Sequence, residues 1–428
     1  MRGPRRDHQR PSPAKPQLRE LEVLRVGAQG DGIAEGPVYL PFTLPGETVR
    51  AKVQAGRGEV LELLTPSPER QAPPCPHFHA CGGCALQHWA DPGYLAWKAG
   101  IIGEALAREH LEAEILPPVA SSPGSRRRLA LHARPGPHED EARLGYKARG
   151  SWALVDIEVC PIADPRLVEK FPALRRLAAA FLEHPRSAPT LHVTWTETGL
   201  DIDVTGVERR TGGLSADRRL TAAQSAEAAG FARVTLAGEL IYQARRPLVR
   251  LGQAVVALPP GGFLQATVQA ETAMGDFVLE AAGNADRVAD LFCGVGTFAL
   301  RLAERAQVLA ADSSAEAIAA LTGAAGATPG LKPIAAEARD LFRRPVLAHE
   351  LKGVQAVVFD PPRAGAEAQA AQIAASGAAR AIGVSCNPAS FARDARILIA
   401  AGFTLERVLP VDQFLWSPHV ELVGVFSR

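Results

Sequence analysis

The chain has 428 residues and a formal net charge of +1, with 47% apolar and 22% charged residues. Domains usually span about 100 to 200 residues, so this length predicts two to four of them. No apolar run approaches the roughly 20 residues of a membrane span, and the near-neutral charge provides no bulk attraction to nucleic acid. The basic N-terminus lacks the apolar stretch of a secretory signal. We therefore expect a cytoplasmic protein without membrane association.

Residues 1–17 are expected to form a flexible basic arm, because Arg and Pro dominate them and only Asp7 carries negative charge. A solvated tail without function is an equally good interpretation. Over residues 18–67, short strand-like runs separated by glycines predict an OB-like β-barrel. Such barrels often bind oligonucleotides, although a folding module without a ligand of its own is the alternative.

Four of the six cysteines form one predicted metal site: Cys75, Cys81, Cys84 and Cys160. The first three lie on a short glycine-containing loop, and Pro161 follows the remote fourth. This spacing is closer to iron–sulfur ligation than to the paired knuckles of zinc sites, so we predict a closed [4Fe-4S] cluster, with zinc as the alternative. Structural disulfides are disfavoured in a reducing cytosol.

Residues 68–250 are expected to form a central α+β domain. Apolar residues at helical spacing predict a helix at about 90–117, which is expected to pack on the C-terminal domain. Alternating runs between Arg126 and Gln243 predict a half-exposed sheet with helices on its other face. The basic residues of these runs indicate either a phosphate-contacting face or a solvated strand edge: Arg126, Arg127, Arg128, Arg134, Lys147 and Arg149.

From 251 to 428, apolar strands alternate with Ala-rich helical segments, which predicts a doubly wound α/β sheet. An expected strand at 288–293 runs into the turn Gly294–Gly296, and the next strand ends at Asp312. Ligands of such sheets gather at the carboxyl ends of the strands. The turn also fits a dinucleotide fingerprint, so NAD competes with S-adenosylmethionine as the predicted ligand.

The most informative pattern is Cys386 in Ser385-Cys-Asn-Pro388, preceded by Asp360-Pro-Pro-Arg363 and followed by His419-Val-Glu421. A thiolate that adds to C6 of a pyrimidine makes an enolate, which takes a methyl group at C5 before a carboxylate removes the C5 proton. A dehydrogenase has no need of these three motifs, so they favour methyl transfer. For an isolated cysteine, a buried strand end is the ordinary interpretation.

Together these motifs resemble the RNA 5-methyluridine methyltransferases, specifically the iron–sulfur branch that modifies ribosomal RNA. The resemblance spans nearly the whole chain and includes further matching segments: Leu44-Pro-Gly-Glu47, Cys84-x-Leu-Gln-His88, Gly262-Phe-Leu-Gln265, Asp290–Gly296 and Ala392-Arg-Asp394. It implies a TRAM-like barrel, a central iron–sulfur and RNA-binding domain at 68–250 and a Rossmann-like class I methyltransferase domain at 251–428. It also implies 23S ribosomal RNA as substrate, with transfer RNA as the alternative, and no obligate protein partner.

The resemblance implies Cys386 as the nucleophile, Glu421 as the base and the four grouped cysteines as ligands of a [4Fe-4S] cluster. The implied contacts to S-adenosylmethionine come from seven residues: Gln265, Phe292, Gly294, Gly296, Thr297, Asp312 and Asp360. Asp340 is a stand-in for an Asn that the family often has near the adenine. Arg363 is expected to hold the uracil together with Asp360, after the uridine has flipped out of its stack.

Several positions depart from the family pattern, among them Thr267, Thr297 and Asp312. The altered segment 413–418 approaches the expected target pocket and leaves the target nucleotide open. Two other classes of protein remain as alternatives: an NAD- or flavin-linked iron–sulfur oxidoreductase and a noncatalytic RNA-binding adaptor.

Overall fold

The computed structural model describes residues 15–138, 140–207 and 213–428, so the first 14 residues of the expected basic arm lie outside it. The chain divides into two compact units. The first comprises residues up to 73 together with 85–94 and 416–418, and the second comprises the rest. Within the described ranges, no helix is both long enough and apolar enough to cross a membrane.

The first unit contains a closed five-stranded barrel with strand order β1-β2-β3-β5-β4. Its strands are β1 (Gln17–Val26), β2 (Gly32–Ala34), β3 (Val38–Leu40), β4 (Thr48–Gln54) and β5 (Arg57–Thr65). Alternate side chains of a strand face opposite sides, and Leu21, Val23 and Val49 are buried in the barrel core. The predicted N-terminal barrel is confirmed.

Helix α1 (Asp91–Arg108) begins in the first unit and passes into the second after Tyr94. It ends before the expected residue 117, because His110 has a left-handed backbone (φ 58°) that a helix cannot continue. In the second unit, Ile102, Ala105 and Leu106 enter the core beneath the C-terminal sheet.

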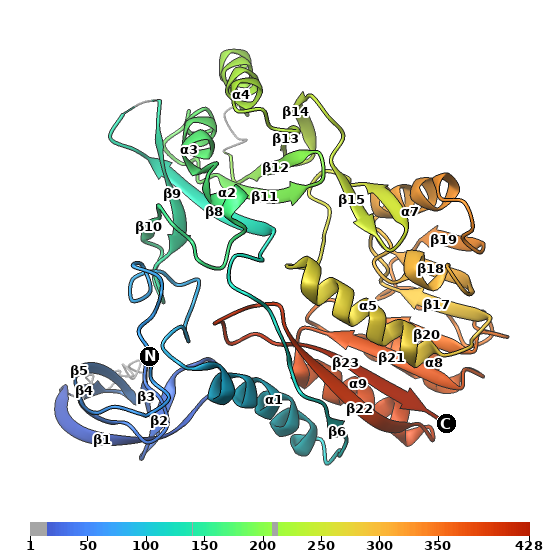
Figure 1. Ribbon diagram of the computed structural model, residues 1–428, viewed down its shortest axis with the longest axis horizontal. Coiled ribbons are helices and arrows are strands. Elements are labelled where there is room, and N and C mark those ends of the chain that lie inside the picture. The colour runs from blue at the N-terminus through green and yellow to red at the C-terminus, as the bar shows by residue number, and fades with distance from the viewer. Residues whose placement is uncertain (1–14, 139, 208–212) are drawn as a thin grey trace, which may run out of the picture. The chain divides into compact units, whose positions relative to one another are not determined.

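A seven-stranded sheet in the second unit has the order β10-β9-β8-β11-β12-β13-β14 (Figure 1). Its strands are β8 (Arg128–Pro135), β9 (Ala142–Lys147), β10 (Leu154–Asp156), β11 (Thr190–Thr196), β12 (Gly199–Thr205), β13 (Arg233–Leu236) and β14 (Glu239–Gln243). After the short α2 (Pro165–Val168), helices α3 (Phe171–Ala179) and α4 (Ala216–Ala228) cover one face of this sheet. Because β8 lies inside the sheet, the solvated strand edge expected for its arginines is wrong.

The C-terminal sheet has nine strands, with β19-β18-β17-β20-β21-β23-β22-β6 in order and β7 also paired to β22. The strands are β6 (Glu114–Ile115), β7 (Val119–Ala120), β17 (Arg287–Leu291), β18 (Gln307–Asp312), β19 (Ile334–Ala338), β20 (Ala356–Phe359), β21 (Arg380–Ser385), β22 (Thr404–Asp412) and β23 (Glu421–Ser427). The five neighbouring strands β19, β18, β17, β20 and β21 are parallel. Strand β23 is antiparallel to both of its neighbours, β21 and β22. A hairpin of β15 (Leu248–Leu251) and β16 (Ala254–Ala257) precedes the sheet.

Helices cover both faces of the C-terminal sheet, as expected for a doubly wound fold. On one face lie α5 (Val268–Ala282), α6 (Ala299–Leu302) and α7 (Ala315–Ala327), and on the other lie α1, α8 (Glu367–Ala375) and α9 (Pro388–Ala400). Successive residues of β20 pack against the helices on opposite faces. Val358 packs on the side of α5, α6 and α7, and Val357 and Phe359 pack on the side of α1, α8 and α9. Burial on both faces explains why these strands are continuous apolar runs.

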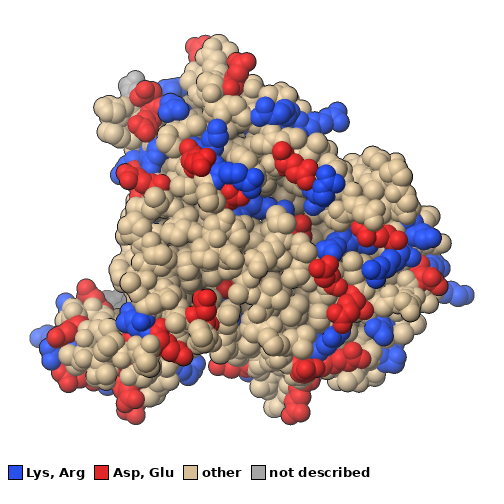
Figure 2. Space-filling model, viewed as in Figure 1, with Lys and Arg blue, Asp and Glu red and all other residues tan. Residues whose placement is uncertain are grey.

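Acidic and basic side chains intermingle on the face shown in Figure 2, in keeping with the net charge of +1. Contacts with a polyanion therefore depend on local groups of side chains and not on a single-sign field.

Candidate active site

The predicted catalytic residues meet at one edge of the C-terminal sheet. Asp360 follows the last residue of β20, and Cys386 follows the last residue of β21. Glu421 opens β23, which runs antiparallel to β21, so its first residue reaches the same edge as the end of β21. Gln413 follows β22, whose carboxyl end lies at this edge for the same reason. Strand pairing thus brings together residues that are up to 61 positions apart in the sequence, as Asp360 and Glu421 are.

The register between β21 and β23 sets Cys386 beside Glu421. Ser385 pairs with Leu422 as the last pair of this antiparallel ladder, and Cys386 and Glu421 are the next residues outward on the two chains. The charge of Glu421 raises the pKa of the Cys386 thiol, so the two side chains lie near each other. Cys386 is half-buried and Glu421 is buried. A thiol and a carboxyl group therefore meet at this sheet edge.

A chain of hydrogen bonds joins Glu421 to Asp360 through two glutamines. Nε2 of Gln413 donates to Oε2 of Glu421 at 2.6 Å and to Oε1 of Gln265 at 2.8 Å. Nε2 of Gln265 donates to Oδ2 of Asp360 at 3.4 Å. The Ala266 amide donates to Oε1 of Gln413 at 2.8 Å, which fixes the orientation of the Gln413 amide. Gln413 was not among the expected site residues, because nothing in the sequence distinguishes this glutamine from a surface one.

Burial changes the protonation of this group of side chains. It raises the pKa of Glu421 to about 8, an effect increased by Asp360 and opposed by the hydrogen bond from Gln413. Burial, with the nearby Asp312, raises the pKa of Asp360 to about 7. Burial also raises the pKa of the Cys386 thiol to about 11; the charges of Glu421 and Asp360 add to this, and that of Arg363 opposes it. Near neutral pH, Cys386 and Glu421 are therefore mainly protonated in this structure.

The turn after β17 has a shape suited to the close approach of a ligand. Phe292 has a φ of 64°, which is an outlier for a bulky residue. The Gly294 amide donates to Oδ2 of Asp312 at 3.0 Å, while a Cβ atom placed on Gly294 would meet open space. In contrast, a Cβ atom on Gly296 would lie 2.5 Å from Leu321, so this glycine is required by packing.

Three carboxyl groups lie near one another at the ends of β17, β18 and β20. Asp290 is fully buried, and burial raises its pKa well above the usual range, with Asp360 and Asp312 adding to the effect. The Asp312 carboxylate also accepts the Ser314 amide at 2.8 Å. Such a group of acids favours a positively charged ligand, which would relieve their mutual repulsion.

The remaining expected residues lie at the margin of the site. Asp340 follows β19, and its carboxylate accepts the amide of Phe342 at 3.0 Å, while the Phe342 ring lies 5.6 Å from that of Phe292. Within the described part of the chain, no hydrogen bond or ion pair joins the Asp340 side chain to the hydrogen-bonded residues Glu421, Gln413, Gln265 and Asp360. Nη2 of Arg363 lies 3.1 Å from Nδ1 of His419, and the Arg363 carbonyl accepts the Asn387 side chain at 2.8 Å.

Consecutive arginines of the central sheet hold the loop that carries Gln265. Nη1 of Arg128 donates to the Leu264 carbonyl at 2.6 Å, and Nε of Arg127 donates to the Gln265 carbonyl at 3.2 Å. Arg127 also forms a buried ion pair with Glu271. The expected phosphate-contacting face is therefore wrong for Arg127, because its guanidinium is turned inward to position the active-site loop.

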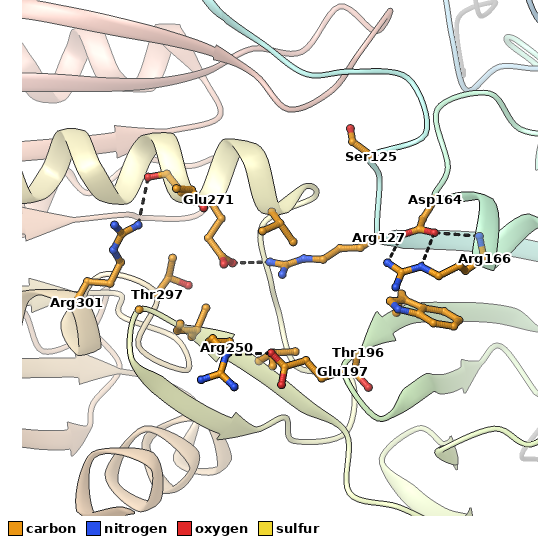
Figure 3. A pocket seen from close by; sticks show the side chains of 16 residues that line it. Ser125, Arg127, Asp164, Arg166, Thr196, Glu197, Arg250, Glu271, Thr297 and Arg301 are labelled. Carbon is orange, nitrogen blue, oxygen red and sulfur yellow. Dashed lines mark hydrogen bonds and ion pairs between the residues drawn. The ribbon is translucent and has the colours of Figure 1, made fainter. Parts of the chain in front are cut away.

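A cavity of about 530 Å³ lies next to this ion pair, bordered by α5, β11 and the β15–β16 hairpin (Figure 3). Its other arginines also pair with acids: Arg166 with Asp164, Arg250 with Glu197 and Arg301 with Asp276. Thr297, an expected cofactor residue, lies in the cavity wall. The cavity thus reaches the turn after β17 but holds no uncompensated positive charge of its own.

Three of the four grouped cysteines lie near Tyr146, a half-buried residue of β9. Burial raises the pKa of Tyr146 well above its usual value, and the charges of Cys160, Cys81 and Cys84 add to this effect. Burial likewise raises the pKa of Cys160 to about 11, with Cys75 and Cys81 adding to it. All four thiols are half-buried, and none of them forms a disulfide. Within the described ranges, no three His, Cys, Asp or Glu side chains are grouped closely enough for a metal-ion site.

Gly82 allows the cysteine loop to lie directly against β9. The Gly82 amide donates to the Lys147 carbonyl at 2.9 Å, and a Cβ atom on Gly82 would lie 2.7 Å from that oxygen. Cys81 forms an isolated bridge with Ala148. The loop is therefore anchored to the strand end beside which Cys160 lies.

Comparison with known proteins places this arrangement among RNA-modifying enzymes. Residues 330–428 match a family described as tRNA (Uracil-5-)-methyltransferase. The chain is 63% identical over 415 residues to an "Uncharacterized RNA methyltransferase" of Caulobacter vibrioides, covering 96% of this chain and 100% of that protein. It is 32% identical over 445 residues to the 23S rRNA (uracil(1939)-C(5))-methyltransferase RlmD of Alkalilimnicola ehrlichii, covering 96% of each.

Among solved structures, the fold is similar to that of a Pyrococcus abyssi tRNA (uracil-54, C5)-methyltransferase in complex with S-adenosyl-L-homocysteine. The TM-score is 0.70 at 22% sequence identity, covering 95% of this chain and 99% of that one. At this identity the likeness shows a shared fold.

Proposed function

The chain belongs to the RNA uracil-5-methyltransferase family, and from this premise we propose that it methylates C5 of a uridine in RNA through a covalent adduct with Cys386. The observation that carries the proposal is the nearness of Cys386, which follows β21, to Glu421, which opens the adjacent antiparallel strand β23 and whose charge raises the pKa of the thiol. An NAD- or flavin-linked oxidoreductase has no use for this pair. A noncatalytic adaptor would not need a buried carboxyl beside a thiol.

In the proposed reaction, the Cys386 thiol loses its proton to solvent, its thiolate forms a bond to C6 of the flipped uracil, and the C5–C6 electron pair moves toward O4 as an enolate. S-Adenosylmethionine supplies an electrophilic methyl group, which C5 takes as the sulfonium–methyl bond breaks. Glu421 then accepts the C5 proton, the C5–C6 double bond forms again and Cys386 leaves as a thiolate. Arg363 is positioned to stabilise the developing negative charge, since its charge already favours the Cys386 thiolate.

The hydrogen-bonded glutamines give Glu421 a fixed orientation toward the substrate. Gln413 donates to Glu421, so it stabilises the ionised carboxylate that must accept a proton. Gln265 extends the same network to Asp360. We propose that Gln413 acts as a positioning residue for the base, and that Asp360 holds the uracil edge or the methyl donor.

The residues around the β17 turn suit S-adenosylmethionine, whose sulfonium and ammonium groups are positive. Asp312 would take the ribose hydroxyls, and the open space at Gly294 would admit the ligand beside the backbone. Five further residues are proposed to border the ligand: Gln265, Phe292, Gly296, Thr297 and Asp360. Asp340 is proposed as an adenine contact at the margin, because Phe342 of its turn lies against Phe292.

We propose further that Cys75, Cys81, Cys84 and Cys160 hold a [4Fe-4S] cluster. The support is the set of donors: four half-buried thiols without a disulfide. Cys81, Cys84 and Cys160 lie near Tyr146, and the charges of Cys75 and Cys81 act on Cys160. When bound, a closed four-cysteine cluster would cross-link the loop at 75–84 to the Cys160 segment. The barrel would then be a TRAM-like RNA-binding module.

Iron and sulfide analysis of protein purified without oxygen tests the cluster. Cys160→Ser should lose iron, whereas the control Cys293→Ala should retain it, because Cys293 lies buried beside the β17 turn. Stoichiometric zinc without iron would contradict the cluster and leave a zinc site in its place.

The proposed substrate is 23S ribosomal RNA, supported by the similarity to RlmD over 96% of each chain. Transfer RNA is the second candidate, favoured by the description of the family that matches residues 330–428. Either substrate places the enzyme in the cytoplasm, with no protein partner required. Mapping 5-methyluridine in RNA from a strain that lacks this protein decides between the two.

Trapping of the adduct tests the chemistry. Glu421→Gln removes the base, so methylated RNA should stay bonded to Cys386 and survive denaturation. Cys386→Ala should abolish turnover, and the double variant should form no adduct. Wild-type rates in Cys386→Ala would exclude covalent catalysis, and absence of an adduct in Glu421→Gln would exclude Glu421 as the base.

A further inference from the structure

The outer face of the seven-stranded sheet is the face opposite to α3 and α4. Leu131, Ala133 and Leu144 point toward those helices and are buried. Alternation along β8 and β9 therefore turns their neighbours to the outer face. These outer residues include His132, Arg134, Arg143 and Lys147.

Cations lie along the outer face of β8 and β9, from the pair Arg134 and Arg143 to Lys147 at the other end of β9. Arg134 pairs directly with Arg143 across β8 and β9, although like charges in opposite positions destabilise a sheet. The side-chain hydrogen bonds of both arginines go to backbone carbonyls, of Ala133 and Pro135 respectively. Among the described residues, no ion pair to a carboxylate involves Arg134, Arg143 or Lys147.

His132 also lies among positively charged side chains of the outer face. Burial lowers its pKa, and the positive charges of Lys147, Arg134 and His192 lower it further. No carboxylate is among the causes of this shift. The hydroxyl of Thr190 lies 2.9 Å from Nδ1 of His132 and orients the ring. The middle of the outer face is thus held at positive potential.

An exposed aromatic ring lies beside these cations. Trp152, in the turn between β9 and β10, is 79% exposed, the highest value among the large hydrophobic residues of the described chain. Nζ of Lys147 lies 3.8 Å from its ring centroid. The Lys147 ammonium lies over the exposed indole ring of Trp152. A nucleobase can stack on such an exposed ring while its phosphate contacts the neighbouring cation.

The outer face leads from Trp152 to the proposed active site. Arg128 and His192 border a small cavity of about 150 Å³ that ends at Gly261 and Gly262. Two acids also line it: Asp201, which pairs with Arg233, and Asp203, which accepts the Thr235 hydroxyl. The next residue, Phe263, is 65% exposed, and the Arg128 guanidinium lies 4.9 Å from its ring centroid. Gln265, two residues on, belongs to the hydrogen-bonded chain of the active site. From Arg134 to Arg128 the strand spans about 20 Å, enough for several nucleotides.

We propose that the outer face of β8, β9 and β11 binds the unpaired RNA that flanks the target uridine, with a base stacked on Trp152 and phosphates on Arg134, Arg143 and Lys147. This inference rests on the proposed function, since it assigns a path to the same RNA substrate. The occupant is single-stranded, because a base inside a duplex offers no free face to an indole ring. The cations bind the phosphates of the RNA, and the exposed ring of Trp152 stacks on an unpaired base, so the face favours single-stranded over duplex RNA.

Binding of fluorescein-labelled single-stranded RNA, measured by anisotropy without S-adenosylmethionine, tests this face. Trp152→Ala should weaken binding of an RNA of about 20 nucleotides by fivefold or more, whereas Trp152→Phe should retain most of the affinity. The triple variant Arg134→Gln, Arg143→Gln, Lys147→Gln should flatten the salt dependence, with the slope falling by about 2.

Two matched controls lie on the helices that cover the other face. Arg176→Gln on α3 removes an exposed charge, and Leu220→Ala on α4 removes an exposed apolar side chain. Both should bind the same RNA like the wild type. In thermal melts no variant should be less stable than the wild type, since removing Arg134 or Arg143 relieves repulsion.

The outcomes separate this inference from the proposed function. Wild-type affinity and salt slope in the variants, or equal losses in the controls, would overturn the inference even where methyl transfer is intact. Equal binding of duplex RNA with the same dependence on Trp152 would overturn its single-stranded occupant. Loss of RNA binding in the variants, in a wild-type protein that transfers no methyl group, would support this face and reject the proposed activity.

Discussion

Replacing Glu421 by glutamine should stabilise the protein above pH 5, because the wild-type carboxyl is costly to bury. The folded-state pKa of Glu421 is about 8, against an ordinary value of 4.5, and burial is the main cause. Between these pH values the unfolded chain releases a proton that the folded protein retains, so stability present below pH 4.5 is lost as pH rises toward 8. Each pH unit in this window costs about 1.4 kcal/mol.

The expected loss between pH 5 and pH 7 is about 2.5 kcal/mol for this one group. A glutamine at the same position can accept the hydrogen bond from Gln413 and does not ionise, so the variant avoids the loss. The difference in melting temperature between variant and wild type should therefore grow between pH 5 and pH 7. For a chain of this length, about 2.5 kcal/mol corresponds to a growth of about 3 °C in favour of the variant.

Thermal denaturation of both proteins from pH 5 to pH 8 measures this difference. The control is Glu406→Gln, which removes an exposed carboxyl from β22 of the same sheet and should leave the two pH profiles parallel. Parallel profiles for Glu421→Gln as well would refute the reasoning, because they would mean that Glu421 ionises as easily in the folded protein as in the unfolded chain.

Two further predictions concern activity and the support of the active-site loop. The ratio kcat/KM for RNA should rise from pH 6 to about pH 8, since Glu421 must be ionised to accept the C5 proton and its pKa is raised to about 8; a flat or falling profile in steady-state methyl transfer would contradict this. Arg127→Ala should destabilise the protein by about 3 to 5 kcal/mol, because it leaves the buried Glu271 without its partner. In thermal melts, the double variant Arg127→Met, Glu271→Leu should regain part of that loss, and equal losses in both variants would count against an unpaired charge as the cause.

The sequence determined the parts of this protein that depend on local chemistry. Strands buried on both faces must be continuous apolar runs, and a tight turn that admits a ligand needs glycine, so the segments around Asp312 and Gly294 could be recognised without coordinates. The barrel followed from short runs between glycines. The motif at Cys386 indicated a nucleophile because its neighbours, Asp360 and Glu421, are chemically suited to one reaction.

Tertiary structure alone decided which polar side chains act together. Gln413 joins Glu421 to Gln265 across 148 positions of sequence, and its amide is ordinary until strand pairing brings the three side chains to one edge. Arg127 looked like a phosphate ligand, yet Glu271 of a distant helix compensates its charge in the interior. The hydrophobic periodicity of a sequence predicts which face of a helix or strand a residue occupies. It does not predict which distant residue contacts that side chain, because such contacts depend on how the elements pack.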